Sequence, residues 1–104
     1  MGRTIISDDK RFEWDESKDQ LNKKKRGFSF SEILEIFDDP AFLEGYDQTH
    51  SVLEDRYYGI GCLNGVLYII AFFTHRDRIR IISARQADNE EQEEYNDYFK
   101  KIKF

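Results

Sequence analysis

An arginine-rich segment, Thr74 to Arg85, holds the side chains of this sequence best suited to bind a charged ligand. It reads THRDRIRIISAR and includes Arg76, Arg78 and Arg80 besides its last residue, set among β-branched apolar residues. The chain has a formal net charge of -5, so this basic segment runs against the bulk charge. Because a guanidinium presents a planar fork of donors that matches phosphate or carboxylate, we expect a phosphate-bearing ligand or an acidic partner here.

The segment and its neighbours also supply the groups that metal-independent RNA cleavage needs. One group must take the 2′-hydroxyl proton, one must protonate the leaving oxygen, and a cation must stabilise the phosphorane-like transition state. Arg80 and Arg85 are candidates for the cation. His75 is a candidate acid or base, because histidine changes charge near neutral pH. Glu91 and Tyr95 are candidates to orient groups or exchange protons.

Each of these assignments has a simpler alternative. Lys25 or Arg26 could hold a flanking phosphate, but the basic run they end also suits the negative end of a helix dipole. The whole polar set could be an ordinary solvated rim. Arg80 and Arg85 have opposite parity along a strand, so both face one cleft only if the strand breaks near Ser83-Ala84.

Other kinds of site are disfavoured. His50, His75 and Cys62 show no metal-site spacing, and the chain has no glycine-rich phosphate loop, so we expect no metal and no cofactor. Cys62 lies in a strand pattern, which favours an inert core thiol. Residues 27–55 carry 8 acidic and no basic side chains, and residues 56–85 carry 5 basic and 1 acidic. Nucleic acid would therefore bind only at a focused basic cleft.

Local patterns in the N-terminal half predict a leader, a strand and two helices. Residues 1–10 read as a disordered leader, and residues 11–14 as a short strand. Asp15 is a good N-cap for a helix over residues 16–26, and Gly27 suits its end. Ser29 and Glu32 match a capping box. The helix that follows has apolar residues at i, i+3, i+4 and i+7, and ends before Pro40.

The C-terminal half predicts strands and a last helix. Residues 42–47 resemble a strand, and residues 48–55 a polar loop. Asn64-Gly65 between apolar runs is a strong hairpin signal, and the run Val66 to Phe73 favours a central strand covered on both faces. Residues 78–83 return as the next strand, with Ile79 and Ile81 on one face. Residues 88–101 form a helix with a capping box at its start.

These elements predict an α+β fold, with a small antiparallel meander sheet packed with two N-terminal helices and a C-terminal helix. We expect residues 11–104 to be a single domain. No apolar run reaches membrane-spanning length, and the first residues lack the apolar stretch of a signal peptide. One cysteine cannot form an internal disulfide, which is consistent with a cytoplasmic location.

Several motifs, in order, resemble the BrnT-like toxins. They are FEWDESK (residues 12–18), N-x-x-K-R-G-F-S-F (22–30), FDDP (37–40), Arg56 with Ile60-Gly61, F-T-x-R (73–76), R-I-I-S-A-R (80–85) and E-x-x-x-Y (91–95). The R-I-I-S-A-R block followed by E-x-x-x-Y is the most specific of them. The resemblance covers about residues 11–99.

The resemblance implies a RelE-like fold and a ribonuclease that arrests translation. It also implies a BrnA-like antitoxin that joins the toxin in a heterotetramer. In this complex, only the antitoxin would contact DNA. By position, an active site would include Arg80, Arg85, Glu91 and Tyr95, with Lys25 and Arg76 as further members. The acidic stretch 88–94 departs from the family pattern, which leaves a second hypothesis of a toxin-like binding module with weak or no catalysis.

Overall fold

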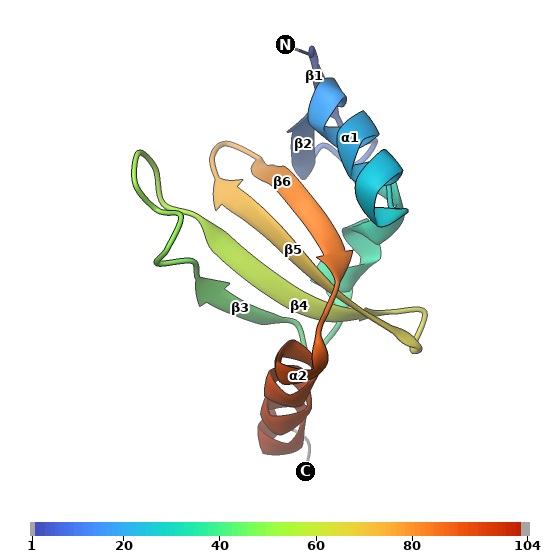
Figure 1. Cartoon of the computed structure of the whole chain (residues 1–104), viewed down its shortest axis with the longest axis vertical. Helices are drawn as coiled ribbons and strands as arrows, with labels where there is room; N and C mark the ends of the chain where they lie inside the picture. The colour runs from blue at the N-terminus through green and yellow to red at the C-terminus, as the bar shows by residue number, and fades with distance from the viewer. Residues whose placement is uncertain (1, 103–104) are drawn as a thin grey trace.

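Within residues 2–102, the part of the chain that the computed structural model describes, six strands form one sheet (Figure 1). The elements are β1 (Thr4–Ile6), β2 (Phe12–Asp15), α1 (Glu16–Arg26), the 3₁₀ helix η1 (Phe30–Asp38), β3 (Leu43–Tyr46), β4 (Tyr57–Leu63), β5 (Leu67–His75), β6 (Ile79–Gln86) and α2 (Asn89–Ile102). The strand order across the sheet is β1-β2-β6-β5-β4-β3. The α+β class is confirmed.

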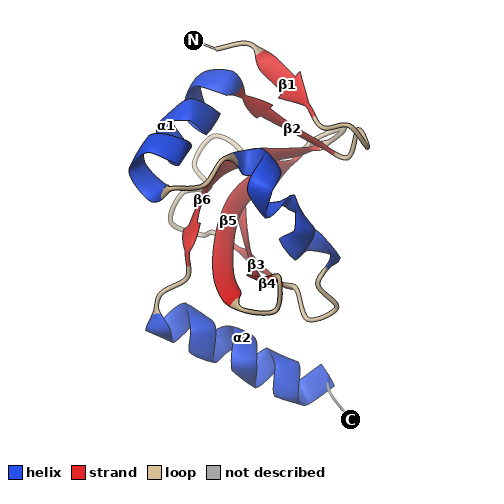
Figure 2. Ribbon diagram, turned by 90° about the vertical axis from the view of Figure 1, so that its right-hand side faces the viewer, coloured by secondary structure: helices blue, strands red, loops and turns tan. Residues whose placement is uncertain are grey.

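Helix η1 covers one face of the sheet, while α1 and α2 lie towards its two ends (Figure 2). Phe30, Ile33 and Ile36 of η1 are fully buried against that face. They pack on strand residues that include Phe73 and Ile81. Burial of large apolar side chains is the main favourable term in folding, so this layer forms the principal core. On the opposite face, Tyr95 of α2 packs with Ile60 and Ile70.

Strands β3 to β6 form the predicted meander. Asn64 and Gly65 have φ values of 55° and 72° at the centre of a tight turn that the Val66 N–H closes on the Leu63 carbonyl, so three residues, 64–66, connect β4 to β5. The register then places Tyr57 opposite Phe73. Strand β5 lies between β4 and β6 and is largely buried, as its continuous apolar run predicts.

The expected disordered leader is not what the structure shows. Thr4–Ile6 form β1, which pairs antiparallel with β2, whereas Met1 lies outside the described residues. The turn between the strands is held by Ser7, whose hydroxyl accepts the Phe12 N–H at 3.0 Å and donates to Asp9 at 2.8 Å. Charged residues mark this segment as polar, but a β-branched triplet and a side-chain-bonded turn give it a strand.

The sheet is also not a purely antiparallel meander. Strand β2 pairs with β6 in parallel, with Phe12 opposite Ile79 and Trp14 opposite Ile81. Both aromatic side chains are buried in the η1 layer. The physical reason for the parallel pairing is that, without β2, the edge of β6 next to the η1 layer would lack hydrogen-bond partners. Periodicity predicts a strand, but not the neighbour with which it pairs.

Helix α1 has the predicted bounds and end residues. The Asp15 carboxylate accepts the N–H groups of Ser17 and Lys18, and Gly27 ends the helix at a φ of 84°. The side chain of Asn22 is buried and joins two separate segments: its amide donates to the Phe28 carbonyl at 2.9 Å, and its carbonyl accepts the Ala84 N–H at 3.0 Å.

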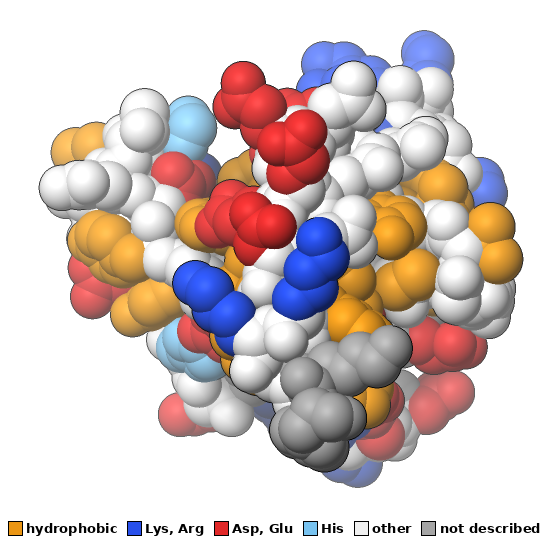
Figure 3. Space-filling model, turned by 90° about the horizontal axis from the view of Figure 1, so that it is seen from below, with side chains coloured by type: hydrophobic (Ala, Val, Ile, Leu, Met, Phe, Trp, Pro, Cys, Tyr) orange, Lys and Arg blue, Asp and Glu red, His pale blue; other side chains and the backbone are white. Residues whose placement is uncertain are grey.

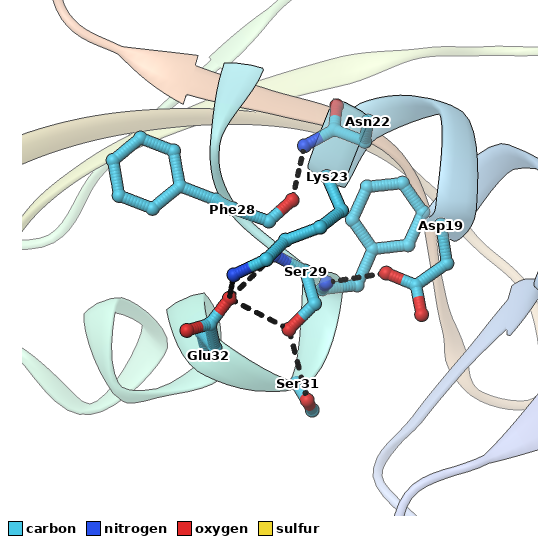
Figure 4. Close-up of polar contacts among 8 residues, drawn as sticks. Asp19, Asn22, Lys23, Phe28, Ser29, Ser31 and Glu32 are labelled. Carbon is cyan, nitrogen blue, oxygen red and sulfur yellow. Dashed lines mark hydrogen bonds and ion pairs between the residues drawn. The ribbon is translucent and has the colours of Figure 1, made fainter. Parts of the chain in front are cut away.

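The predicted second helix forms, but with 3₁₀ geometry. Glu32 accepts the Ser29 backbone N–H at 2.7 Å, the expected reciprocal bond of a capping box, and also binds Lys23 at 3.0 Å (Figure 4). The Ser29 N–H, with Lys23, lowers the pKa of the Glu32 carboxyl to about 2. Asp19 accepts the Phe30 N–H, so α1 and η1 are joined by several polar contacts.

Helix α2 begins with the predicted capping box. Asp88 accepts the Glu91 N–H at 2.8 Å, and Glu91 accepts the Asp88 N–H at 2.9 Å. Figure 3 views the molecule from this end and shows acidic side chains grouped on its surface. Within residues 2–102, no helix is both long and apolar enough to cross a membrane.

Strand β6 contains a bulge that the sequence does not reveal. Phe72 pairs with Ser83 and Phe73 pairs with Ile81, so Ile82 has no partner on β5. The bulge shifts the alternation of faces, and Ile81 and Ala84 are both buried in the η1 layer despite their odd spacing.

We predict that Asn22→Ala destabilises the fold by roughly 1–3 kcal/mol, because it leaves the Ala84 N–H and the Phe28 carbonyl buried without a partner. The measurement is urea unfolding followed by circular dichroism. The control is Gln20→Ala, an exposed position on the same helix, which should change stability by no more than about 0.5 kcal/mol. Equal stability of both variants would contradict the role given to Asn22.

Candidate active site

The bulge in β6 brings Arg80 and Arg85 to the same face of the sheet. Thr74 lies opposite Arg80, Phe72 opposite Ser83, and Ile70 opposite Arg85. Because Ile81 and Ala84 point into the η1 layer, both arginines point to the other face. Their opposite parity requires an irregularity in the strand between them. The structure provides it as a bulge at Ile82, whereas the sequence suggests a break near Ser83-Ala84.

A hollow of about 160 Å³ opens on this face between the two arginines along β6. Its walls come from the β3–β4 loop and from strands β5 and β6. The lining residues are Asp47, His50, Arg56, Phe72, Ile82 and Ser83. We call it the central hollow. It combines a cation, a histidine, a hydroxyl and an aromatic ring, which are groups that bind a phosphate, a proton and a base.

A second hollow, of about 260 Å³, lies beside α1 and shares Ile82 and Ser83 with the first. We call it the α1 hollow. Its basic lining residues are Lys18, Lys25 and Arg26. Among residues 2–102, neither Lys25 nor Arg26 has an ion-pair partner. The two hollows therefore form a continuous surface with free cations at one end.

Arg85 is held in place by Glu91. Two parallel hydrogen bonds, of 2.8 and 2.9 Å, join its guanidinium to the carboxylate. The pairing raises the pKa of Arg85, and the same hydrogen bonds lower the pKa of Glu91. The Arg85 Cζ lies 5.7 Å from the centre of the Phe72 ring, which lines the central hollow. The predicted pair of Arg85 and Glu91 thus lies together at the edge of the hollow.

Arg80 is also paired, with Glu13 of β2 across the parallel strand pair. Both side chains are mostly buried, at 21% and 14% exposure. Arg56 differs, because its guanidinium has no ion-pair partner among the residues the structure describes. Arg56 is therefore the cation of the central hollow without an ion-pair partner, whereas Arg80 and Arg85 are each held by a carboxylate on either side of Ile82 and Ser83 along β6.

His75 and Arg76 do not join this site. His75 follows Phe73 on the η1 side of the sheet, packs edge-on against Tyr57 at 4.8 Å, and has its Nε2 2.9 Å from a Glu44 oxygen. Arg76 donates to both oxygens of Glu54, at 3.0 and 3.1 Å, and so ties the β5–β6 turn to the β3–β4 loop.

Tyr95 lies in a separate cluster at the α2 end. Its hydroxyl donates to Asp39 at 2.6 Å, and its ring packs with Ile60 and Ile70. Burial and the Asp39 carboxylate raise the pKa of Tyr95. Burial also raises the pKa of the Cys62 thiol, in line with an inert core thiol. The Tyr95 side chain thus anchors α2 to the sheet.

The sequence reasoning missed His50, Asp47, Phe72 and Ser83. The one signal in the sequence for His50 is an Asp-x-x-His spacing in a polar loop just before Arg56. Among residues 2–102, no group of three or more His, Cys, Asp or Glu side chains is placed to hold a metal ion.

Comparisons with known proteins identify the family of this chain. Residues 14–91 match the family described as "Ribonuclease toxin, BrnT, of type II toxin-antitoxin system". A search of curated proteins gives no match. The crystal structure of the Brucella abortus ribonuclease toxin BrnT is similar, with a TM-score of 0.59 and 29% sequence identity over 73% of this chain and 94% of that chain.

The matched range includes α1, η1, the meander and the Arg85–Glu91 pair. The resemblance seen in the sequence motifs is confirmed. The chain therefore belongs to the BrnT family of ribonuclease toxins of type II toxin–antitoxin systems.

Proposed function

We propose that this protein is an endoribonuclease toxin that cleaves single-stranded RNA on the open face of its sheet, without a metal ion or other cofactor. The observation that carries the proposal is the pair of hollows that meet at Ile82 and Ser83, which lie between Arg80 and Arg85 along β6. Backbone phosphates need cations at intervals along a groove, and unstacked bases need an aromatic surface. The two hollows offer both.

The arginines have distinct roles in this proposal. Arg85, held rigidly by Glu91, and Arg56, which is free, face the phosphate that is cleaved and stabilise its developing charge. Arg80 completes the site from the other end of the strand. Lys25 and Arg26 hold a neighbouring phosphate in the α1 hollow. Phe72 offers a ring face for a base.

The proposed partner is a BrnA-like antitoxin, which neutralises the toxin in a heterotetramer and alone contacts DNA. Family membership supports this partner class. We also propose a cytoplasmic site of action, where RNA is available, and a place for the fold in the RelE-like superfamily. The single cysteine, which forms no disulfide, suits a reducing compartment.

A second candidate function is a toxin-like binding module with little catalysis. The Arg85–Glu91 pair favours it, because a carboxylate that occupies both arms of the guanidinium competes with a phosphate. Capture of an antitoxin by a chain that leaves RNA intact would support this second function.

We predict that Arg85→Ala lowers the rate of RNA cleavage by roughly 10²–10³-fold, since one transition-state donor is lost. Arg56→Ala should also lower the rate of RNA cleavage. Cleavage of a labelled single-stranded RNA by the purified chain measures this. The control is Lys24→Ala, a neighbouring exposed cation outside the lining of both hollows, which should leave the rate within a few-fold. Unchanged cleavage by both arginine variants would contradict the proposed function.

We predict that Glu91→Gln distinguishes two roles of Glu91: orienting the Arg85 guanidinium, or blocking it from a phosphate. If Glu91 positions Arg85, as proposed, the variant should cleave RNA more slowly, by up to roughly 10²-fold, because a displaced catalytic group costs that much. An increase in rate would instead show that the carboxylate masks the arginine and would support the second candidate function. Circular dichroism of both proteins controls for the loss of the α2 capping box.

We predict that growth arrest caused by the toxin alone is relieved by co-expression of a BrnA-like antitoxin. Light scattering of the purified complex should give the mass of a heterotetramer. A chain that neither arrests growth nor co-purifies with such an antitoxin would contradict the proposed partner.

A further inference from the structure

The structure contains two histidine–carboxylate pairs, and only one of them lies at the central hollow. His50 Nδ1 is 3.0 Å from an Asp47 oxygen, and both residues line that hollow. His75 Nε2 is 2.9 Å from a Glu44 oxygen, on the η1 side of the sheet. The pairs are similar in distance, so their positions distinguish them.

Asp47 is well placed to control the chemistry of His50. Its side chain is only 13% exposed, whereas the His50 ring is 63% exposed. Because the carboxylate contacts Nδ1, that nitrogen carries the proton, and the lone pair of the neutral ring is left on Nε2. Among residues 2–102, no partner engages Nε2. The ring therefore keeps a proton acceptor free, at a position that lines the central hollow and an adjoining hollow that shares His50 and Arg56 with it.

The loop that carries His50 is closed at its base. The Asp47 N–H donates to the Arg56 carbonyl at 2.8 Å. The Ser51 hydroxyl accepts the Arg56 N–H and donates to the Asp47 carbonyl, at 2.8 and 2.7 Å. The Arg76–Glu54 ion pair ties the outer part of the loop to the β5–β6 turn. These bonds fix His50 beside Arg56 without help from a ligand.

We propose that His50 is the general base of the RNA cleavage reaction, and that Asp47 positions it. This inference rests on the proposed function. His50 Nε2 takes the proton of the RNA 2′-hydroxyl, and the oxygen forms a bond to the adjacent phosphorus. The bond from phosphorus to the 5′-oxygen breaks, and that oxygen takes a proton from water. The products are a 2′,3′-cyclic phosphate and a 5′-hydroxyl, and His50 returns its proton to solvent.

The test uses the full-length chain and a labelled single-stranded RNA of mixed sequence. His50→Ala should cleave it roughly 10²–10⁴-fold more slowly than the parent, the usual contribution of a general base. Binding should stay within a few-fold, measured on the same sequence with 2′-O-methyl groups, which cannot be attacked. Mass spectrometry of the parent's products should show 2′,3′-cyclic phosphate ends.

The second histidine pair provides matched controls. His75→Ala and Glu44→Gln should cleave within a few-fold of the parent, whereas Asp47→Asn should lose at least about 10-fold because it removes the control of the ring tautomer. Added imidazole should restore part of the activity of His50→Ala and none of the activity of Arg85→Ala. A merely structural role for His50 would not give this rescue.

The outcomes separate the two levels of the proposal. If the parent cleaves RNA, and His50→Ala cleaves within a few-fold of it, the inference about His50 is wrong while the proposed function stands. The same holds if His75→Ala, rather than His50→Ala, loses activity. If the well-folded parent leaves RNA intact, the proposed function and this inference both fail.

Discussion

Strand β6 needs hydrogen-bond partners along both of its edges, and the rest of the structure is arranged around this need. On one edge β5 pairs along its whole length except at Ile82. On the other edge β2 pairs only over Ile79–Ile81, after which the Asn22 side chain takes the Ala84 N–H. A buried backbone donor without a partner is costly, so α1 must sit where Asn22 can reach the strand. This places the basic end of α1 beside the bulge and opens the α1 hollow there.

The bulge turns this structural constraint into a site. A regular strand would send Arg80 and Arg85 to opposite faces, and one of the two would enter the η1 core. The unpaired Ile82 shifts the alternation, so that Ala84 is buried and both arginines face away from the core. Bulges often re-aim side chains next to active sites, and here Ile82 and Ser83, which lie between the two arginines along β6, line the central hollow.

Local sequence signals predicted the parts of this fold that depend on local physics. The Asp15 cap, the Gly27 end and the Asn64-Gly65 turn each depend on the backbone within a few residues, and each is confirmed. The parallel pairing of β2 with β6 and the strand β1 depend on distant neighbours, which periodicity cannot report. The same contrast between near and distant contacts holds for the residues of the candidate site. Arg85 and Glu91 lie six residues apart, were both named as candidates and contact each other, whereas grouping His50 with Phe72 requires the closed β3–β4 loop.

The charge pattern of the site is compatible with the proposed binding of RNA by an acidic chain. Arg80 and Arg85 each have a carboxylate partner, so their net contribution to long-range attraction is small, but their guanidinium groups are rigid. In this proposal the attraction comes from the lining cations that have no ion-pair partner among residues 2–102, which are Arg56 in the central hollow and Lys18, Lys25 and Arg26 in the α1 hollow. Binding and positioning are thus divided between two sets of residues. Because the free cations lie on one continuous face, the molecule does not need an overall positive charge, and its net charge of -5 opposes binding of nucleic acid elsewhere on the surface.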